Sequence, residues 1–242
     1  MNAIQIENLT KRYKDALAVD GLSLTIEQGE LFSLLGVNGA GKTTTIKMLC
    51  GLTEPTSGEA LLQGKSICKE PAAVKALIAV APQETAVARG LSVLENLELI
   101  CGVHGFSKEK RSARIAEVTA LLGLDEVLRR KAGKLSGGWQ RRLSIAMALI
   151  SEPEILFLDE PTLGLDVLAR SDLWDVIRGL KGNVTIILTT HYMEEAEALS
   201  DRIAIMARGK LLTCGTPDEI KASAGAASIE QAFVTIVKGA GK

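Results

Sequence analysis

Eight consecutive residues near the start of the chain have the types and spacing of a phosphate-binding turn. They read Gly36-Val37-Asn38-Gly39-Ala40-Gly41-Lys42-Thr43 and fit the P-loop pattern G-x-x-x-x-G-K-[ST]. The glycines allow a tight turn whose backbone N–H groups point at phosphate oxygens. Lys42 supplies a charge for the β- and γ-phosphates, and Thr43 offers a hydroxyl to Mg²⁺. We expect a nucleotide to contact Gly36, Asn38, Gly39, Ala40, Gly41, Lys42, Thr43 and Thr44.

A second stretch places two carboxylates at the end of an apolar run. Ile155-Leu156-Phe157-Leu158 is followed directly by Asp159 and Glu160. A continuous apolar run of this length is typical of a buried central strand. Next to a P-loop, Asp159 is predicted to hold Mg²⁺ directly or through water, and Glu160 is placed to polarise an attacking water.

Polar residues also follow two other predicted strands. Gln83 comes after the apolar run 78–81, and His191 comes after the run 184–190. In α/β proteins, ligands bind at the carboxyl ends of parallel strands. The Gln83 amide can coordinate a metal or orient water, and His191 can bond to a γ-phosphate oxygen. Taken alone, each residue is better explained by an ordinary role: a loop amide for Gln83 and a helix-cap histidine for His191.

Another glycine turn opens a long predicted helix, 139–150. Leu135-Ser136-Gly137-Gly138 has the character of a second anion-binding helix N-terminus, although a simple helix cap explains the same residues. One nucleotide cannot easily meet both phosphate sites in one chain, but it could bridge two subunits. Asp166 ends the loop that leaves the two carboxylates, and it is a plausible cap for the helix 167–178.

Tyr13 is the candidate for contact with a nucleotide base. It is one of two tyrosines and is predicted to lie in the basic turn 11–14. An exposed tyrosine before the P-loop strand could stack on adenine, or it could pack on a small sheet.

The elements that must position these residues alternate between strands and helices. The P-loop joins a strand at 31–35 to a helix beginning at Thr43, and strands at 3–9 and 22–26 form an antiparallel opening section. The section 84–131 lacks strand patterns and contains helices at 92–99 and 108–122. A hairpin surrounds Arg208-Gly209, and an amphipathic helix follows Ser228.

The predicted fold is therefore α/β: a P-loop NTPase core with a mostly parallel sheet, an N-terminal antiparallel β subdomain and an inserted all-helical subdomain. We expect residues 1–242 to form a single domain. Its parts are the core at 1–83 and 152–220, the helical subdomain at 84–151 and a helical tail at 221–242.

Composition restricts the class of protein. The chain has 242 residues, of which 47% are hydrophobic, and its net charge of −1 argues against bulk attraction to nucleic acid or anionic lipid. Its four cysteines are far apart, which indicates a reducing compartment and no metal site. The N-terminus lacks a secretion signal, and no apolar stretch approaches the length of a membrane span. Any membrane role is expected to come through a partner.

The order of these motifs resembles the ATPase subunit of an ATP-binding cassette (ABC) transporter. The matching elements span nearly the whole chain: Tyr13, the P-loop, Gln83, 135–138, 155–160, 165–166 and His191. The resemblance implies ATP and Mg²⁺ as ligands and a homodimer, or a dimer with a related cassette. ATP would lie between the P-loop of one subunit and Ser136-Gly137-Gly138 of the other, with Asp166 nearby.

The same resemblance assigns roles to the isolated polar residues. It implies that Tyr13 stacks on adenine, that Gln83 contacts Mg²⁺ and the partner, and that His191 senses the γ-phosphate. It implies a separate transmembrane permease, no direct nucleic-acid partner, and a peripheral position on the cytoplasmic face of the membrane. The helical insertion and the Gln83 loop would contact that permease.

One position departs from the family pattern. The usual LSGGQ has Trp139 in its fifth position here, and Gln140 is displaced by one residue. Because the serine and both glycines remain, phosphate contact should survive, but a contact by the fifth residue is in doubt. The segments 43–49, 139–143 and 229–233 are similar to exporter-type bacterial cassettes for drugs, sodium or polysaccharide.

Two other functions fit parts of the sequence. Soluble cassette ATPases that act on nucleic acid or the ribosome generally carry two cassettes or a long coiled-coil insertion. This chain has one cassette, no heptad run and no basic excess. A nucleotide-gated binding protein without hydrolysis would not need Glu160 and His191. The sequence therefore favours the ATP-hydrolysing subunit of a transporter.

Overall fold

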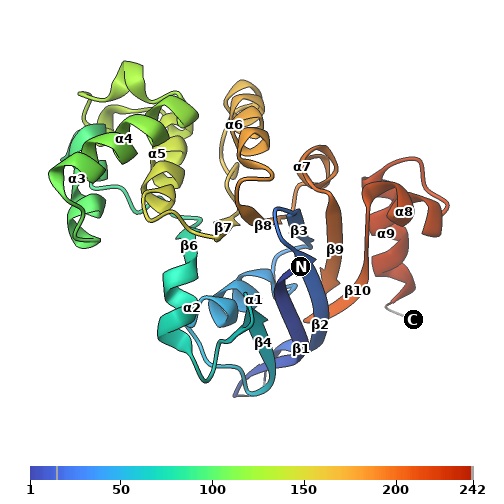
Figure 1. Ribbon diagram of the computed structural model, residues 1–242. Helices are drawn as coiled ribbons and strands as arrows, with labels where there is room; N and C mark the ends of the chain where they lie inside the picture. The colour runs from blue at the N-terminus through green and yellow to red at the C-terminus, as the bar shows by residue number, and fades with distance from the viewer. Residues whose placement is uncertain (15, 241–242) are drawn as a thin grey trace.

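The computed structural model describes residues 1–14 and 16–240, and their strands form two sheets (Figure 1). The first sheet has four strands in the order β2-β1-β4-β5: β1 Asn2–Tyr13, β2 Ala16–Glu27, β4 Ser57–Leu62 and β5 Lys65–Ser66. The second has six strands in the order β10-β9-β3-β8-β7-β6: β3 Leu31–Leu35, β6 Ile78–Ala81, β7 Ile155–Asp159, β8 Thr185–Thr190, β9 Arg202–Ala207 and β10 Lys210–Gly215.

Nine α-helices are present within the described residues. They are α1 Lys42–Leu49, α2 Pro71–Leu77, α3 Val93–Val103, α4 Lys108–Leu122, α5 Gly137–Leu149, α6 Val167–Leu180, α7 Met193–Leu199, α8 Pro217–Ser223 and α9 Ile229–Gly239. Two short 3₁₀ turns, Asp125–Val127 and Ala132–Lys134, precede α5. No helix in residues 1–14 and 16–240 is long and apolar enough to cross a membrane.

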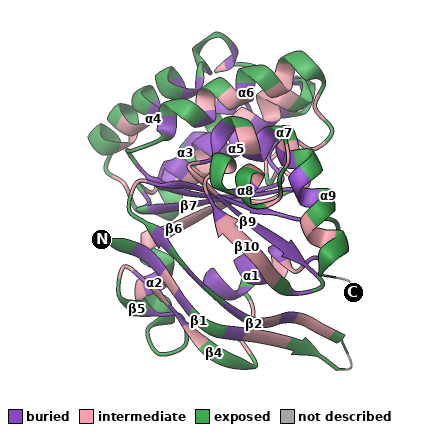
Figure 2. Cartoon of the chain, turned by 90° about the vertical axis from the view of Figure 1, so that its right-hand side faces the viewer, coloured by how far each residue is buried: buried purple, intermediate pink, exposed green. Residues whose placement is uncertain are grey.

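The larger sheet is mostly parallel, and its central strands are buried along their whole length. All residues of β3, β7 and β8 are buried, which is the pattern of strands covered on both faces. Figure 2 shows these strands as a buried layer, with α3 to α7 on one side and α1 on the other. The parallel register pairs Leu35 with Thr190 and Asp159 with Thr189, so three strand ends meet at one edge. The predicted α/β class with a mostly parallel sheet is confirmed.

The antiparallel sheet is also confirmed, but its first two strands are longer than predicted. Strand β1 continues beyond Leu9 to Tyr13, and Tyr13 pairs with Ala16 of β2. The prediction that Tyr13 lies in a turn is therefore wrong. The basic residues that suggested a turn face solvent along a paired ribbon whose register shifts hide the alternation of a regular strand.

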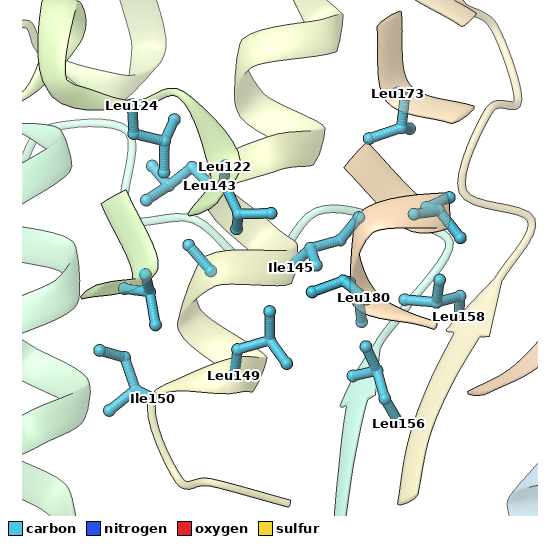
Figure 3. Close-up of a cluster of buried hydrophobic side chains, with 14 of the residues drawn as sticks. Leu122, Leu124, Leu143, Ile145, Leu149, Ile150, Leu156, Leu158, Leu173 and Leu180 are labelled. Carbon is cyan, nitrogen blue, oxygen red and sulfur yellow. The ribbon is translucent and has the colours of Figure 1, made fainter. Parts of the chain in front are cut away.

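The helices α3, α4 and α5 follow β6 and return to β7, and Figure 1 shows them grouped on one side of the molecule. Their apolar faces join a cluster with β7 and α6, in which Ile145 and Leu149 of α5 lie near Leu180 (Figure 3). Helix α5 begins at Gly137, two residues before the predicted start, with Ser136 as its N-cap. The glycines of this turn thus belong to the first turn of the helix.

Candidate active site

The turn between β3 and α1 is confined by backbone from two other strands. A Cβ atom on Gly36 would lie 2.5 Å from the carbonyl oxygen of Met206 in β9. Gly41, which caps α1 with φ 104°, would place a Cβ atom 2.6 Å from the carbonyl oxygen of Ala18 in β2. Only glycine fits at these two positions, and the turn leads directly into the N-terminus of α1, where the first N–H groups have no acceptor within the helix.

A cavity of about 380 Å³ lies against this turn. It brings together many of the residues that the sequence analysis singled out. The cavity is lined by Asn38, Gly39, Ala40, Gly41, Lys42, Thr43, Thr44, Gln83, Glu160, Leu163 and His191. The lining therefore combines a helix N-terminus, a lysine and polar side chains from the ends of β6, β7 and β8.

Lys42 is 4% exposed and turns back over its own loop. Its Nζ donates to the carbonyl oxygen of Gly36 at 2.7 Å and lies 3.6 Å from Oε1 of Glu160. Burial lowers the pKa of Lys42, whereas the Glu160 carboxylate opposes that change. The ammonium group is thus held at the cavity wall between the P-loop and the strand-end carboxylates.

The Asp159 carboxylate is oriented by two hydroxyl groups. Its Oδ1 accepts from Oγ1 of Thr43 at 3.4 Å and from the buried hydroxyl of Thr189. Oxygen donors from the P-loop helix and from β7 therefore converge beside the cavity, as a hard cation such as Mg²⁺ requires. Among the residues described, no three His, Cys, Asp or Glu side chains are grouped closely enough to form a metal site. This donor set fits Mg²⁺, which commonly takes one or two protein oxygens together with substrate phosphates.

Glu160 is held in an unusual backbone conformation that aims its side chain at the cavity. Its φ is 47°, and its N–H donates to the carbonyl and hydroxyl oxygens of Thr189. Oε2 of Glu160 lies 3.1 Å from Nδ1 of His191, a hydrogen-bond distance for the imidazole tautomer that carries its proton on Nδ1. A strained non-glycine residue at such a position often marks a functional site.

Other predicted residues lie outside this cavity. The turn Ser136-Gly137 is exposed, and the Ser136 hydroxyl makes no capping bond to α5. Asp166 caps α6 by accepting from the N–H of Ala169 at 2.9 Å, as its position in the sequence suggested. Tyr13 is 44% exposed at the end of β1, with Nζ of Lys11 4.9 Å from its ring centroid.

Two residues with clear roles in this geometry were missed by sequence reasoning. Thr189 orients both Asp159 and the backbone of Glu160, and Leu163 lines the cavity. The signal for Thr189 was the alignment of strand ends, because it pairs with Asp159 across β7 and β8. Leu163 carried no chemical signal, because an apolar residue in a loop has no distinctive pattern.

The family profile described as ABC transporter matches residues 19–163, more than half of the chain. The chain belongs to the ABC transporter family. The match includes the P-loop, the Gln83 loop, the turn Ser136-Gly137-Gly138 (the signature turn) and the two carboxylates Asp159 and Glu160 at the end of β7.

Relatives of this ABC cassette are similar over nearly all of its length. A probable multidrug ABC transporter ATP-binding protein, YbhF of Escherichia coli K12, is 38% identical over 240 residues, which are 97% of this chain and 41% of that protein. The daunorubicin resistance ATP-binding protein DrrA3 of Streptomyces coeruleorubidus is 40% identical over 229 residues, covering 94% and 72% of the two chains. This chain thus spans less than half the length of the first relative.

A solved structure shares the fold. CbiO1 of Clostridium perfringens, part of the ABC transporter complex cbiONQ, superimposes with a TM-score of 0.85 at 27% identity, covering 91% of each chain. The present chain is an ABC ATP-binding cassette, a domain that binds ATP and is an ATPase. The names of the two relatives, YbhF and DrrA3, refer to multidrug transport and to daunorubicin resistance.

Proposed function

We propose that this cassette hydrolyses ATP to power a separate transmembrane permease. The observation that carries the proposal is the position of Glu160, whose carboxylate lies between Lys42 and His191 at the wall of the P-loop cavity. A general base must lie within hydrogen-bond reach of the water it activates. Here Glu160 would take the proton of a water that attacks the γ-phosphorus, and ADP would be the leaving group.

The surrounding side chains have separate tasks in this proposal. Lys42 and the P-loop N–H groups would bind the β- and γ-phosphates, and His191 would orient Glu160 and contact a γ-phosphate oxygen. Thr43, Asp159 and Gln83 would hold Mg²⁺. When bound, Mg²⁺ would neutralise charge that develops on the phosphate oxygens. Tyr13 would stack on the adenine.

The exposed signature turn supports a dimer with ATP at the interface. Ser136, Gly137 and Gly138 open α5 away from the chain's own cavity, and the Ser136 hydroxyl makes no capping bond to its own helix. A helix N-terminus of this kind is suited to the phosphates held by a second cassette. Asp166 would lie beside that contact. We propose a homodimer or a dimer with a related cassette, in which each chain is a single domain, 1–242. Its parts would be the core at 1–83 and 152–220, a helical subdomain at 84–151 and a tail at 221–242.

A groove next to the Gln83 loop supports the docking of a permease there. It has a volume of about 320 Å³ and lies between β6, α3 and α5, with Ile100 and Met147 in its lining. Leu99 and Val103 of the same helix, α3, are large apolar residues that are 50% and 75% exposed. A permease contact here would keep the cassette at the cytoplasmic face of the membrane. Export is the direction supported by the names of two relatives, one a multidrug transporter protein and the other a daunorubicin resistance protein, and no nucleic-acid partner is proposed.

The base and the dimer are tested by one pair of variants. Glu160→Gln removes the base and keeps Lys42, Thr43 and Asp159, so ATP binding should survive while hydrolysis slows about a hundredfold or more. Because hydrolysis reopens the dimer, the variant should accumulate as a dimer with ATP. Size-exclusion chromatography with saturating ATP measures this directly.

The second variant adds Ser136→Arg to the same chain. Its bulky side chain would fill the phosphate position at the N-terminus of α5, so the ATP-dependent dimer should disappear. Dimerisation of the double variant as strong as that of the single variant would refute the dimer with ATP at its interface. A soluble ATPase acting on nucleic acid or the ribosome is the alternative, and it predicts no co-purification with membranes.

A further inference from the structure

Arg141 is a buried cation that the proposed reaction does not use. It lies one turn inside α5 and is 5% exposed. Its Nη1 donates to the carbonyl oxygen of Pro82 at 2.7 Å, and its Nη2 donates to that of Gln83 at 2.7 Å. The two arms of one guanidinium therefore hold two successive carbonyl groups of the loop that follows β6.

Burying the guanidinium of Arg141 costs desolvation free energy, which its two hydrogen bonds offset only while their geometry is good. Burial lowers the pKa of Arg141, and the carboxylates of Asp159 and Glu195 act in the opposite direction by favouring its charge. Whole buried ion pairs are often replaced by apolar residues of similar volume without loss of stability, so a buried charge is weak evidence of a role in stability alone. The planar fork, by contrast, binds two acceptors in one fixed orientation.

The two ends of this contact belong to different parts of the proposed reaction. Gln83 lines the cavity of the chain's own P-loop. Ser136, Gly137 and Gly138 lie at the N-terminus of the helix that carries Arg141. Because an α-helix moves as a stiff unit over one turn, the carbonyl of Gln83 and the signature turn must shift together as long as both hydrogen bonds persist.

We propose that Arg141 is a positioning residue that couples the Gln83 loop to the signature turn. Contact of Gln83 with Mg-ATP at the P-loop of one chain sets the orientation of the turn that the same chain presents to the nucleotide of the second copy. The inference rests on the proposed dimer only for this last step. Coupling between Gln83 and α5 is a property of one chain.

The single-chain step is tested by amide hydrogen exchange on a chain that carries Glu160→Gln and Ser136→Arg. This parent should bind Mg-ATP without hydrolysing it and without forming the ATP-dependent dimer. Mg-ATP should slow exchange in both the P-loop, 36–44, and the start of α5, 137–145. Adding Arg141→Lys keeps the charge but removes the fork, so the response of 137–145 should be lost while that of 36–44 is retained.

Arg114→Lys is the matched control. Arg114 lies on α4, and its guanidinium also donates to a backbone carbonyl, that of Leu149 at the end of α5. It contacts neither carbonyl of the Gln83 loop in the hydrogen bonds described. Both exchange responses should survive in this variant. Arg141→Met, which removes the charge and both donors, should reproduce the loss, and a thermal unfolding transition for each variant reports whether it is folded.

Two results of this experiment would overturn the coupling. One is an Arg141→Lys chain in which 137–145 still responds to Mg-ATP. The other is the loss of both responses, which would make Arg141 a structural support of the whole site.

A double-mutant cycle extends the test to the dimer, with Glu160→Gln as the parent. Arg141→Lys should weaken ATP-dependent dimerisation about tenfold in the parent and hardly at all when Gln83→Ala is present, because the two residues act in series. Additive losses would refute the coupling. If Glu160→Gln itself never dimerises, the proposed ATP-dependent dimer is refuted. The exchange experiment on the single chain still decides the role of Arg141.

Discussion

The P-loop and the signature turn both place glycines at the N-terminus of an α-helix but have opposite surroundings. Each is a glycine turn that opens an α-helix. Gly36 and Gly41 of the P-loop face backbone carbonyls of β9 and β2 at distances that exclude any side chain. Gly137 and Gly138 of the signature turn have neighbours only from α6 and the loop before it, and Ser136 is exposed.

This difference shows how one motif, a glycine turn at a helix N-terminus, serves two purposes. The P-loop turn has a lysine, two carboxylates and a histidine gathered around it, so it can bind and process a phosphate within one chain. The signature turn has the N–H groups of a helix start and a free hydroxyl, but no catalytic side chain lies beside it. A turn of the second kind is complete only when another surface supplies the nucleotide.

The strongest way to break the comparison is to remove the charge that only the P-loop has. Lys42→Ala should lower the rate of hydrolysis by about a hundredfold or more and should also weaken ATP binding. The substitution removes the ammonium group that would contact the β- and γ-phosphates. Lys47→Ala, on the exposed face of the same helix, should change neither. Nucleotide fluorescence and phosphate release measure the two quantities. Near-normal values for Lys42→Ala would mean that the P-loop has been assigned the wrong role.

Thr189→Val tests whether the carboxylates depend on their supporting hydroxyl. The change keeps the shape of a fully buried residue but removes the bonds to Asp159 and to the N–H of Glu160. We expect the rate of hydrolysis to fall roughly 10- to 100-fold, as it does for residues that hydrogen-bond to a metal ligand without contacting the metal themselves. Thr185→Val at the other end of β8 removes a hydroxyl bonded to the N–H of Gly29, and it should leave turnover intact. Equal losses in both variants would indicate a general effect on the sheet.

Tyr13 sharpens the comparison on the base side of the nucleotide. If its ring stacks on adenine, Tyr13→Ala should weaken ATP binding by roughly 1–2 kcal/mol and Tyr13→Phe should have little effect. Titration with a fluorescent ATP analogue distinguishes the two. Large, equal losses would point to the hydroxyl group, and no loss with alanine would leave Tyr13 as a packing residue on β1.

The smallest effect is expected at the unusual fifth position of the signature. Trp139 is half-buried against the helical cluster, and the guanidinium carbon of Arg142 lies 5.1 Å from its ring centroid. Trp139→Gln should therefore lower the free energy of unfolding by roughly 1 kcal/mol and leave ATP binding by the single chain unchanged. Urea unfolding measures the first. A lower ATP affinity in the isolated chain would tie Trp139 to the P-loop site.

Local chemistry made much of this cassette predictable. The P-loop pattern, the apolar run before Asp159 and Glu160, and the strand ends at Gln83 and His191 depend on neighbours in the sequence. Their spacing was enough to predict the α/β class and the cavity residues around the P-loop. The capping role of Asp166 was predictable for the same reason, because it involves residues three positions apart.

Tertiary structure determined the features that depend on register and on distant contacts. Tyr13 belongs to a strand because β2 pairs with it, although its neighbours are basic and polar. Thr189 supports Asp159 because parallel strands β7 and β8 align their ends. Arg141 reaches Pro82 and Gln83 across 59 and 58 positions, a contact that no periodicity in the sequence encodes. The folded chain alone brings that guanidinium to the loop, because only packing of α5 beside β6 makes the two carbonyls its neighbours.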